Sequence, residues 1–72
     1  MLDMESFGRR LAELRHKQNL TQRTVAERCC VSIQAVSKWE CGKSCPDLLI
    51  LDELAKVLRV EIKDFFEEQK SS

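Results

Sequence analysis

Three polar side chains with hydrogen-bonding groups lie on one side of a short amphipathic segment near the middle of the chain. Gln34, Ser37 and Lys38 share one face at helical spacing, while Val36 and Trp39 turn to the other. Glutamine can bond adenine through two atoms, and lysine can reach O6 and N7 of guanine. A helix about 10 Å wide fits the major groove of B-form DNA, roughly 12 Å across. The pattern predicts a helix that can read base edges.

Two short helices joined by a tight corner must hold these side chains outward. They are predicted over residues 22–29 and from Ser32 or Ile33 to Glu40, and Thr21 and Ser32 precede them as candidate caps. The break at Cys30-Val31 is too short for anything but a sharp bend between packed helices. The narrow apolar stripe of the first helix consists of Val25, Ala26 and Cys29.

This segment resembles the helix-turn-helix of the phage-repressor-like (Cro and Xre) family of DNA-binding regulators. The fragments that match the family in order and spacing are Leu20-Thr21-Gln22, Val31-Ser32, Ser37 to Glu40, Gly42-Lys43-Ser44 and Pro46-Asp47-Leu48. The family pattern also has three preferred residue types within the motif. It has a small residue at the position of Ala26, a glycine at that of Cys30 and a branched aliphatic residue at that of Val36. Cys30 replaces the glycine and would have to adopt a positive φ, at a cost of about 1 kcal/mol.

The resemblance covers about residues 7–66 and implies an all-α, lambda-repressor-like fold of five short helices. Helices 2 and 3 would form the helix-turn-helix. Its base-reading positions are held by Ile33, Gln34, Ser37 and Lys38, and an exposed isoleucine can meet a thymine methyl group. In the family, residues at the positions of Gln22, Lys43 and Ser44 contact phosphates. The predicted DNA-binding residues are Gln22, Arg23, Ser32, Ile33, Gln34, Ser37, Lys38, Lys43 and Ser44.

The resemblance also implies a buried ion pair between Arg15 in the first helix and Glu40 at the end of the third. Such a pair would hold these two helices together. Removing either partner of a buried pair costs roughly 3–5 kcal/mol. The alternative is two solvated charges.

The remaining segments complete a single domain over residues 1–72, with a core of about 5–68 and a frayed tail at 69–72. A first helix is predicted over residues 5–18, a fourth starting at Pro46, and a last short one over 62–68. Leu49 and Ile50 add more apolar surface than one small core needs, which favours a partner. Ile62, Phe65 and Phe66 are the candidate dimer residues.

The net charge of zero argues against binding of nucleic acid, but the charged residues are unevenly distributed along the chain. Residues 1–43 hold eight Lys and Arg against five Asp and Glu, whereas residues 44–72 hold four against seven. One end can therefore face phosphates. No apolar run reaches the roughly 18 residues of a membrane span, and the N-terminus has no signal-peptide pattern, so we expect a cytoplasmic protein.

The four cysteines are interpreted as reduced thiols, because the helical pattern supplies its own core. A zinc site of Cys29, Cys30, Cys41 and Cys45 is the alternative. Zinc sites prefer cysteine pairs separated by two to four residues, whereas Cys29 and Cys30 are adjacent and point their thiols apart. Redox sensing by Cys41 or Cys45 is a second alternative, because Lys43 could acidify their thiols. No cofactor or metal is predicted.

The leading functional hypothesis is a sequence-specific transcriptional regulator, expected to repress, that binds a near-palindromic operator in double-stranded DNA as a homodimer. The alternative is an antitoxin or adaptor of the same fold that binds another protein. An enzyme is disfavoured, since the chain has one histidine, no tyrosine and no glycine-rich phosphate loop. A core this small also has little room for a pocket.

Overall fold

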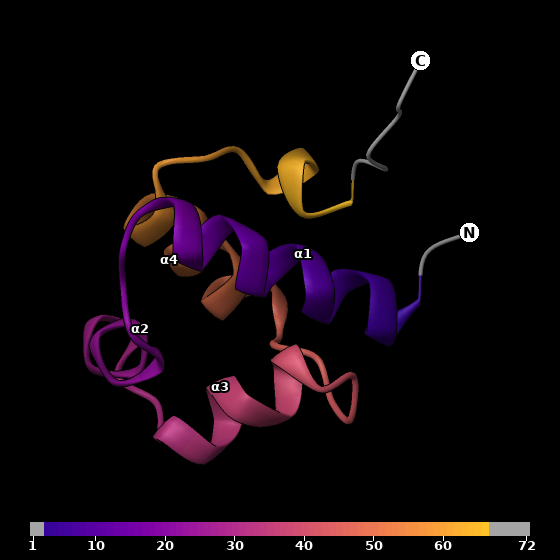
Figure 1. The fold of residues 1–72 in the computed structure, drawn as a ribbon, viewed down its shortest axis with the longest axis horizontal. Coiled ribbons are helices and arrows are strands. Elements are labelled where there is room, and N and C mark those ends of the chain that lie inside the picture. Colours follow the sequence, from indigo (N-terminus) through magenta and orange to yellow (C-terminus); the bar gives the residue numbers. More distant parts are fainter. Residues whose placement is uncertain (1–2, 67–72) are drawn as a thin grey trace.

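The computed structural model describes residues 3–66, which form helices and no strand. The elements are α1 (Met4–Lys17), α2 (Gln22–Cys29), α3 (Ile33–Glu40), α4 (Leu48–Leu58) and a short 3-10 turn, η1 (Ile62–Phe65). Helix α1 packs against α3, and α2 packs against both α3 and α4. In Figure 1, α1 crosses above α3, α2 is seen nearly end-on, and α4 lies behind α1. The predicted all-α class is confirmed.

Each α-helix begins at a side-chain cap that accepts a hydrogen bond from a backbone N–H three residues on. The capping residues are Asp3, Thr21, Ser32 and Asp47. Their donor–acceptor distances are 2.7, 3.0, 3.0 and 2.9 Å. The hydrogen bonds that Asp3 accepts from Ser6 hold the pKa of this carboxyl group below its usual value. These contacts fix the starting points of the four α-helices of the described residues.

Three predicted boundaries differ from the structure. Helix α1 spans 4–17 rather than 5–18, since Asp3 caps it. Helix α4 begins at Leu48 and not at Pro46, because Asp47 is extended and serves as the cap, which leaves Pro46 outside. The last segment forms η1, closed by reciprocal contacts of Glu61 and Asp64, instead of a helix over 62–68. Residues 67 and 68 of that prediction, and the tail at 69–72, lie outside the described residues.

Three residues other than glycine adopt the left-handed conformation next to helix ends. Asn19, Cys30 and Arg59 have φ of 58°, 59° and 60°. The expected positive φ at Cys30 is therefore present, and Arg59 adopts it as well. For residues such as Cys30 and Arg59 this conformation costs roughly 1–2 kcal/mol each, whereas Asn tolerates it better. The corner of the helix-turn-helix is consequently a strained point of the backbone.

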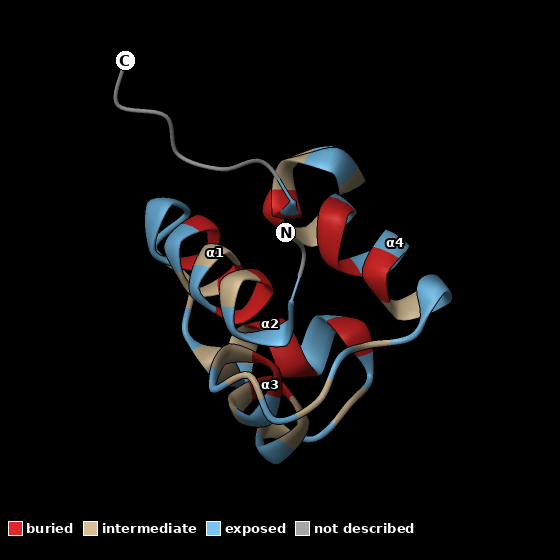
Figure 2. Ribbon diagram, turned by 90° about the vertical axis from the view of Figure 1, so that its right-hand side faces the viewer, coloured by how far each residue is buried: buried red, intermediate tan, exposed pale blue. Residues whose placement is uncertain are grey.

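One contiguous apolar core joins all four helices and η1, and the buried faces of the helices turn toward it in Figure 2. Its members are Phe7, Leu11, Leu14, Val25, Ala26, Cys29, Val36, Trp39, Leu51, Leu54, Ala55, Leu58 and Phe65. Phe65 is only 1% exposed, and its ring centroid lies 5.5 Å from that of Phe7. The structure thus differs from the expectation of an exposed Phe65, because η1 folds back and packs this ring into the chain's own core.

Close contact between α1 and the end of α3 depends on Gly8. A Cβ atom built there would collide with the carbonyl oxygen of Trp39 and lie 2.7 Å from that of Glu40. Gly42, with φ of 77°, is equally close to α1, since its Cβ would lie 2.8 Å from Cγ of Glu5. Both contacts set how near α1 and the C-terminal end of α3 can approach.

We predict that Gly8→Ala lowers the free energy of unfolding by about 1–3 kcal/mol, the usual range for overpacking. Helix propensity alone predicts the opposite, a gain of about 1 kcal/mol. Chemical denaturation followed by circular dichroism measures the difference. Glu13→Ala, on the exposed side of the same helix, is the control and should change stability by less than about 0.5 kcal/mol. A stabilised Gly8→Ala protein would contradict the close approach.

Candidate nucleic-acid interface

The outer face of α3 carries polar side chains on a helix that is fixed from behind. Gln34 and Lys38 are exposed and Ser37 is half-buried, whereas Val36 and Trp39 are buried in the core. Ile33 differs from the prediction of an exposed side chain. It is half-buried and packs partly against the core, so only part of it is available to a ligand.

The first turn of α2 lies beside this face as a second source of donors. Gln22 is half-buried at the first helical position, and Arg23 is exposed. Thr21 accepts from the N–H of Thr24, and its hydroxyl also donates to Thr24 Oγ1 over 3.1 Å. The N–H groups of Gln22 and Arg23 precede the first intrahelical bond and have no acceptor within the helix. Such free N–H groups, together with the helix dipole, favour an anion at this end.

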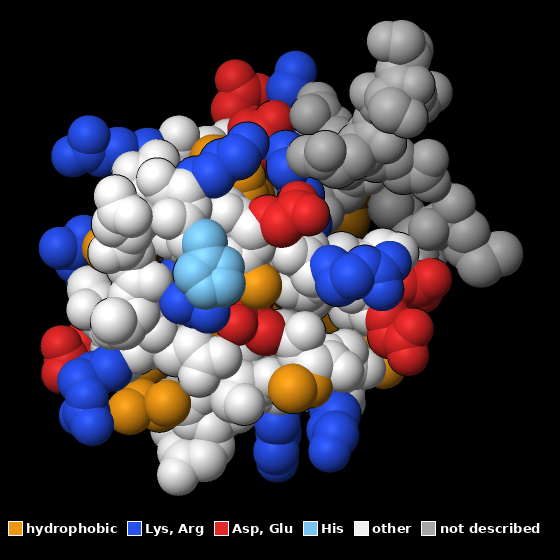
Figure 3. Space-filling view, in the orientation of Figure 1, with side chains coloured by type: hydrophobic (Ala, Val, Ile, Leu, Met, Phe, Trp, Pro, Cys, Tyr) orange, Lys and Arg blue, Asp and Glu red, His pale blue; other side chains and the backbone are white. Residues whose placement is uncertain are grey.

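The loop after α3 adds positive charge next to Lys38. The backbone N–H of Lys43 donates to the carbonyl oxygen of Lys38 over 2.9 Å, so the two lysines leave the backbone at neighbouring points. Lys43 is exposed and Ser44 is half-buried. In Figure 3, basic side chains project from the lower edge, where α3 lies in Figure 1, and the acidic side chains visible on this face lie higher.

The predicted ion pair between Arg15 and Glu40 is present and nearly buried, with side-chain exposures of 11% and 9%. Arg15 Nε donates to Glu40 Oε2 over 2.6 Å, and Arg15 Nη2 donates to Glu40 Oε1 over 3.0 Å. A third donor, Nη1, bonds the carbonyl oxygen of Leu20 over 2.8 Å. A carboxylate at a helix C-terminus is disfavoured by the dipole, and the guanidinium compensates for it.

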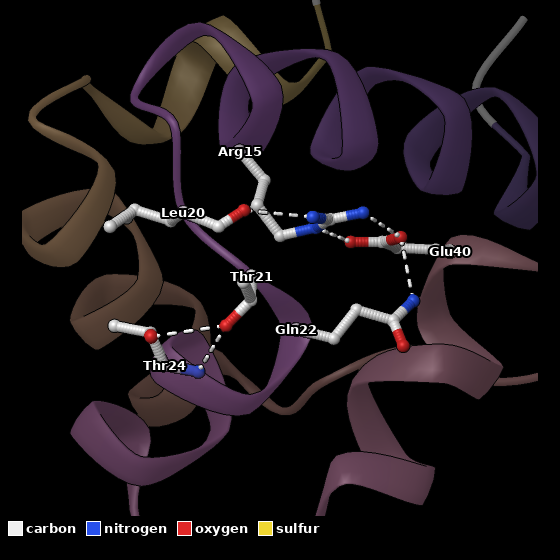
Figure 4. A network of polar contacts seen from close by, with 6 residues as sticks. All are labelled: Arg15, Leu20, Thr21, Gln22, Thr24 and Glu40. Carbon is white, nitrogen blue, oxygen red and sulfur yellow. Dashed lines mark hydrogen bonds and ion pairs between the residues drawn. The ribbon is translucent and has the colours of Figure 1, made fainter.

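Gln22 joins this network in a way that sequence reasoning missed. Its Nε2 donates to Glu40 Oε1 over 2.9 Å, so the same carboxylate contacts α1 through Arg15 and α2 through Gln22 (Figure 4). No local signal predicts a contact across 18 residues. Gly8 was also missed, although a glycine inside a predicted helix is a recognised sign of close packing.

The cysteines do not gather into a metal-binding group. Cys29 is buried, and Cys30, Cys41 and Cys45 are exposed free thiols. Among residues 3–66, no three His, Cys, Asp or Glu side chains are placed to hold an ion together, so the zinc hypothesis gains no support. Burial raises the pKa of the Cys29 thiol, with smaller contributions in the same direction from Glu53 and Cys30.

Comparison with known families agrees with this arrangement. The sequence profile of the helix-turn-helix family matches residues 11–65, which include α2, α3 and α4. The chain belongs to the helix-turn-helix family, of the Cro and Xre type. None of the helices within the described part of this helix-turn-helix domain is long and apolar enough to cross a bilayer.

Curated relatives of the domain are regulators of transcription. It is 41% identical over 58 residues to the HTH-type transcriptional activator BcrR of Enterococcus faecalis, a match that covers 81% of this chain and 28% of BcrR. It is 38% identical over 61 residues to the HTH-type transcriptional regulator PuuR of Escherichia coli, covering 85% of this chain and 33% of PuuR. The chain thus spans about a third or less of the relatives it matches.

Solved structures of regulators share the fold. The restriction-modification controller protein C.AhdI of Aeromonas hydrophila superposes with a TM-score of 0.83 at 32% identity, covering 88% of this chain and 96% of that one. The clp gene regulator ClgR of Corynebacterium glutamicum gives a TM-score of 0.85 at 26% identity, covering 92% and 70%.

We predict that Arg15→Met lowers the free energy of unfolding by about 3–5 kcal/mol, because it leaves the Glu40 carboxylate buried without its partner. Urea denaturation measures the loss. Lys56→Met is the matched control, since the Lys56–Asp52 pair is 68% and 53% exposed and should contribute at most about 1 kcal/mol. Equal losses in the two variants would mean that the Arg15–Glu40 pair behaves as a solvated one.

Thiol chemistry gives a second prediction. The thiolate is the reactive form, so a buried thiol with a raised pKa reacts slowly. An aromatic disulfide reagent at neutral pH should modify Cys30, Cys41 and Cys45 rapidly in the folded protein. Cys29 should follow only on unfolding, and urea-unfolded protein is the control. Peptide mapping that finds Cys29 labelled as fast as Cys41 would contradict its burial.

Proposed function

We propose that this helix-turn-helix domain is a sequence-specific DNA-binding regulator that reads the major groove with α3. The observation that carries the proposal is the orientation of α3, whose Val36 and Trp39 are buried while Gln34 and Lys38 face outward. Lys43, Ser44 and the first turn of α2 flank this face with donors for phosphates. In DNA complexes such contacts fix the register of the protein, and base-edge contacts supply sequence preference.

We further propose that two copies bind a near-palindromic operator, with their recognition helices about 34 Å apart. Phe65 is excluded from the contact by its burial, which leaves Ile62 and Phe66 of the original candidates. Leu48 and Leu49, at the start of α4, are 72% and 82% exposed and extend this set. Phe66 lines an apolar hollow of about 240 Å³ together with Met4, Phe7, Pro46 and Leu51. A second copy of the chain that covers these apolar side chains would remove them from water.

The direction of regulation is proposed as repression, through exclusion of polymerase from an overlapping promoter. The relative BcrR is named an activator, so activation is the alternative. A reporter gene with the selected operator inside its promoter separates the two, because repression lowers its expression and activation raises it.

A second candidate function is an antitoxin or adaptor that binds another protein. The exposed leucines of α4 and the zero net charge favour it. Salt dependence separates the two functions. Affinity for DNA falls steeply as salt rises because bound counterions are released, whereas contact through an apolar groove depends on salt much less.

We predict that the protein enriches a specific duplex from random DNA, and that Gln34→Ala or Lys38→Ala reduces the preference at a contacted base by about 1–3 kcal/mol. Competition binding with single-base variants of the enriched duplex gives the measurement. Lys56→Ala, at an exposed position of α4, is the matched control and should leave the preference at every base unchanged. If both α3 variants discriminate as well as the parent, α3 is not the reading element.

Leu49→Lys tests the proposed dimer surface. The side chain is almost fully exposed, so the variant should fold, while loss of its burial in both copies should raise the dimer dissociation constant at least about tenfold. Sedimentation equilibrium measures this constant. Gln18→Lys, at an exposed position just after α1, adds the same single charge away from this face and is the control. A Leu49→Lys protein that dimerises like the parent would exclude this face.

A further inference from the structure

We infer that Glu40 is a positioning residue for DNA-backbone binding, because its carboxylate orients the Gln22 side chain at the start of α2. The inference rests on the proposed function and adds to it a role for a residue that does not itself face the DNA. Gln22 Nε2 lies 2.9 Å from Glu40 Oε1, and that oxygen also accepts from Arg15.

A glutamine amide has two orientations that exchange its oxygen and nitrogen atoms. The carboxylate of Glu40 accepts hydrogen bonds and cannot donate one. Only the orientation that turns the Gln22 nitrogen toward Glu40 is compatible with it, since the other sets two oxygens against each other. The NH₂ group carries a second N–H, which this contact leaves unused. Glu40 therefore selects the orientation in which Gln22 keeps a donor next to the start of α2.

Three N–H donors near the start of α2 have no acceptor within the described part of the protein that would prevent them from binding a phosphate. The backbone N–H of Thr24 donates to the Thr21 side chain over 3.0 Å, and the backbone N–H of Val25 donates to the Thr21 carbonyl oxygen over 3.1 Å. The backbone N–H groups of Gln22 and Arg23 come before these bonds and lie at the positive end of α2. The remaining side-chain N–H of Gln22 adds a third donor, while a flipped amide would present an oxygen to the phosphate instead.

Arg15 makes this use of a carboxylate possible. An unpaired carboxylate next to a phosphate-binding point would repel the anion, but Arg15 contacts both oxygens of Glu40 over 2.6 and 3.0 Å. Its charge is thus neutralised while Oε1 still accepts from Gln22. An apolar pair at the same two positions could hold α1 against α3 but would leave the Gln22 amide without an acceptor.

A double-mutant cycle on DNA affinity tests the inference, using the duplex enriched by the parent protein. Gln22→Met should weaken binding about tenfold in the parent, the value of one hydrogen bond to a charged group, and less than about twofold when Glu40→Met, which removes the acceptor, is already present. The salt slope should not change with Gln22→Met, because glutamine neutralises no phosphate charge. Arg23→Ala is the matched control and should weaken binding by the same factor in both backgrounds.

Glu40→Asp repeats the cycle with the charge kept and the reach shortened, and circular dichroism verifies that each variant is folded. The shorter Asp side chain should still pair with Arg15 but no longer reach Gln22, so that DNA affinity no longer depends on Gln22. If Gln22→Met costs the same factor with and without Glu40, or if Arg23→Ala shows the same coupling, Glu40 does not act through Gln22. A parent protein that enriches no duplex would refute the proposed function and this inference together, whereas a parent that binds while Gln22→Met has no effect refutes only the inference.

Discussion

One carboxylate joins the three helices on which the recognition surface depends. Glu40 ends α3, and its two oxygens accept from Arg15 of α1 and Gln22 of α2. The apolar core fixes α3 from behind by close packing of Val36 and Trp39, although hydrophobic contact itself has no direction. The three hydrogen bonds at Glu40 are directional and add to this packing. A polar contact at the C-terminal end of α3 therefore helps to orient the outward side chains of the same helix.

The close packing of α1 against the same end of α3 supports this polar contact. Gly8 lets the backbone of α1 approach the last carbonyl groups of α3, and that short separation brings the guanidinium within reach of Glu40. Buried ion pairs often add little stability compared with an apolar pair of similar size. Here the pair also provides an acceptor for Gln22 and compensates a negative helix end, which an apolar pair cannot do.

Much of the fold could be predicted from local sequence, because caps and apolar spacing act within a few residues. Thr21 and Ser32 start their helices as expected, and Cys30 adopts the positive φ that the missing glycine requires. Pro46 was misplaced because a proline in the first turn and an aspartate cap are both valid ways to begin a helix, and here Asp47 is the cap. The burial of Phe65 and the contact of Gln22 with Glu40 could not be predicted, because their partners, Phe7 and Glu40, come from distant parts of the chain.

The left-handed helix ends at Asn19, Cys30 and Arg59 have a consequence for how long the protein persists in a cell. A domain of about this size is stabilised by only roughly 4–11 kcal/mol, and strained backbone lowers that margin. Any partner that binds the folded form at a hundred times its dissociation constant adds about 2.7 kcal/mol. Copies without a binding site would unfold more often and be degraded first.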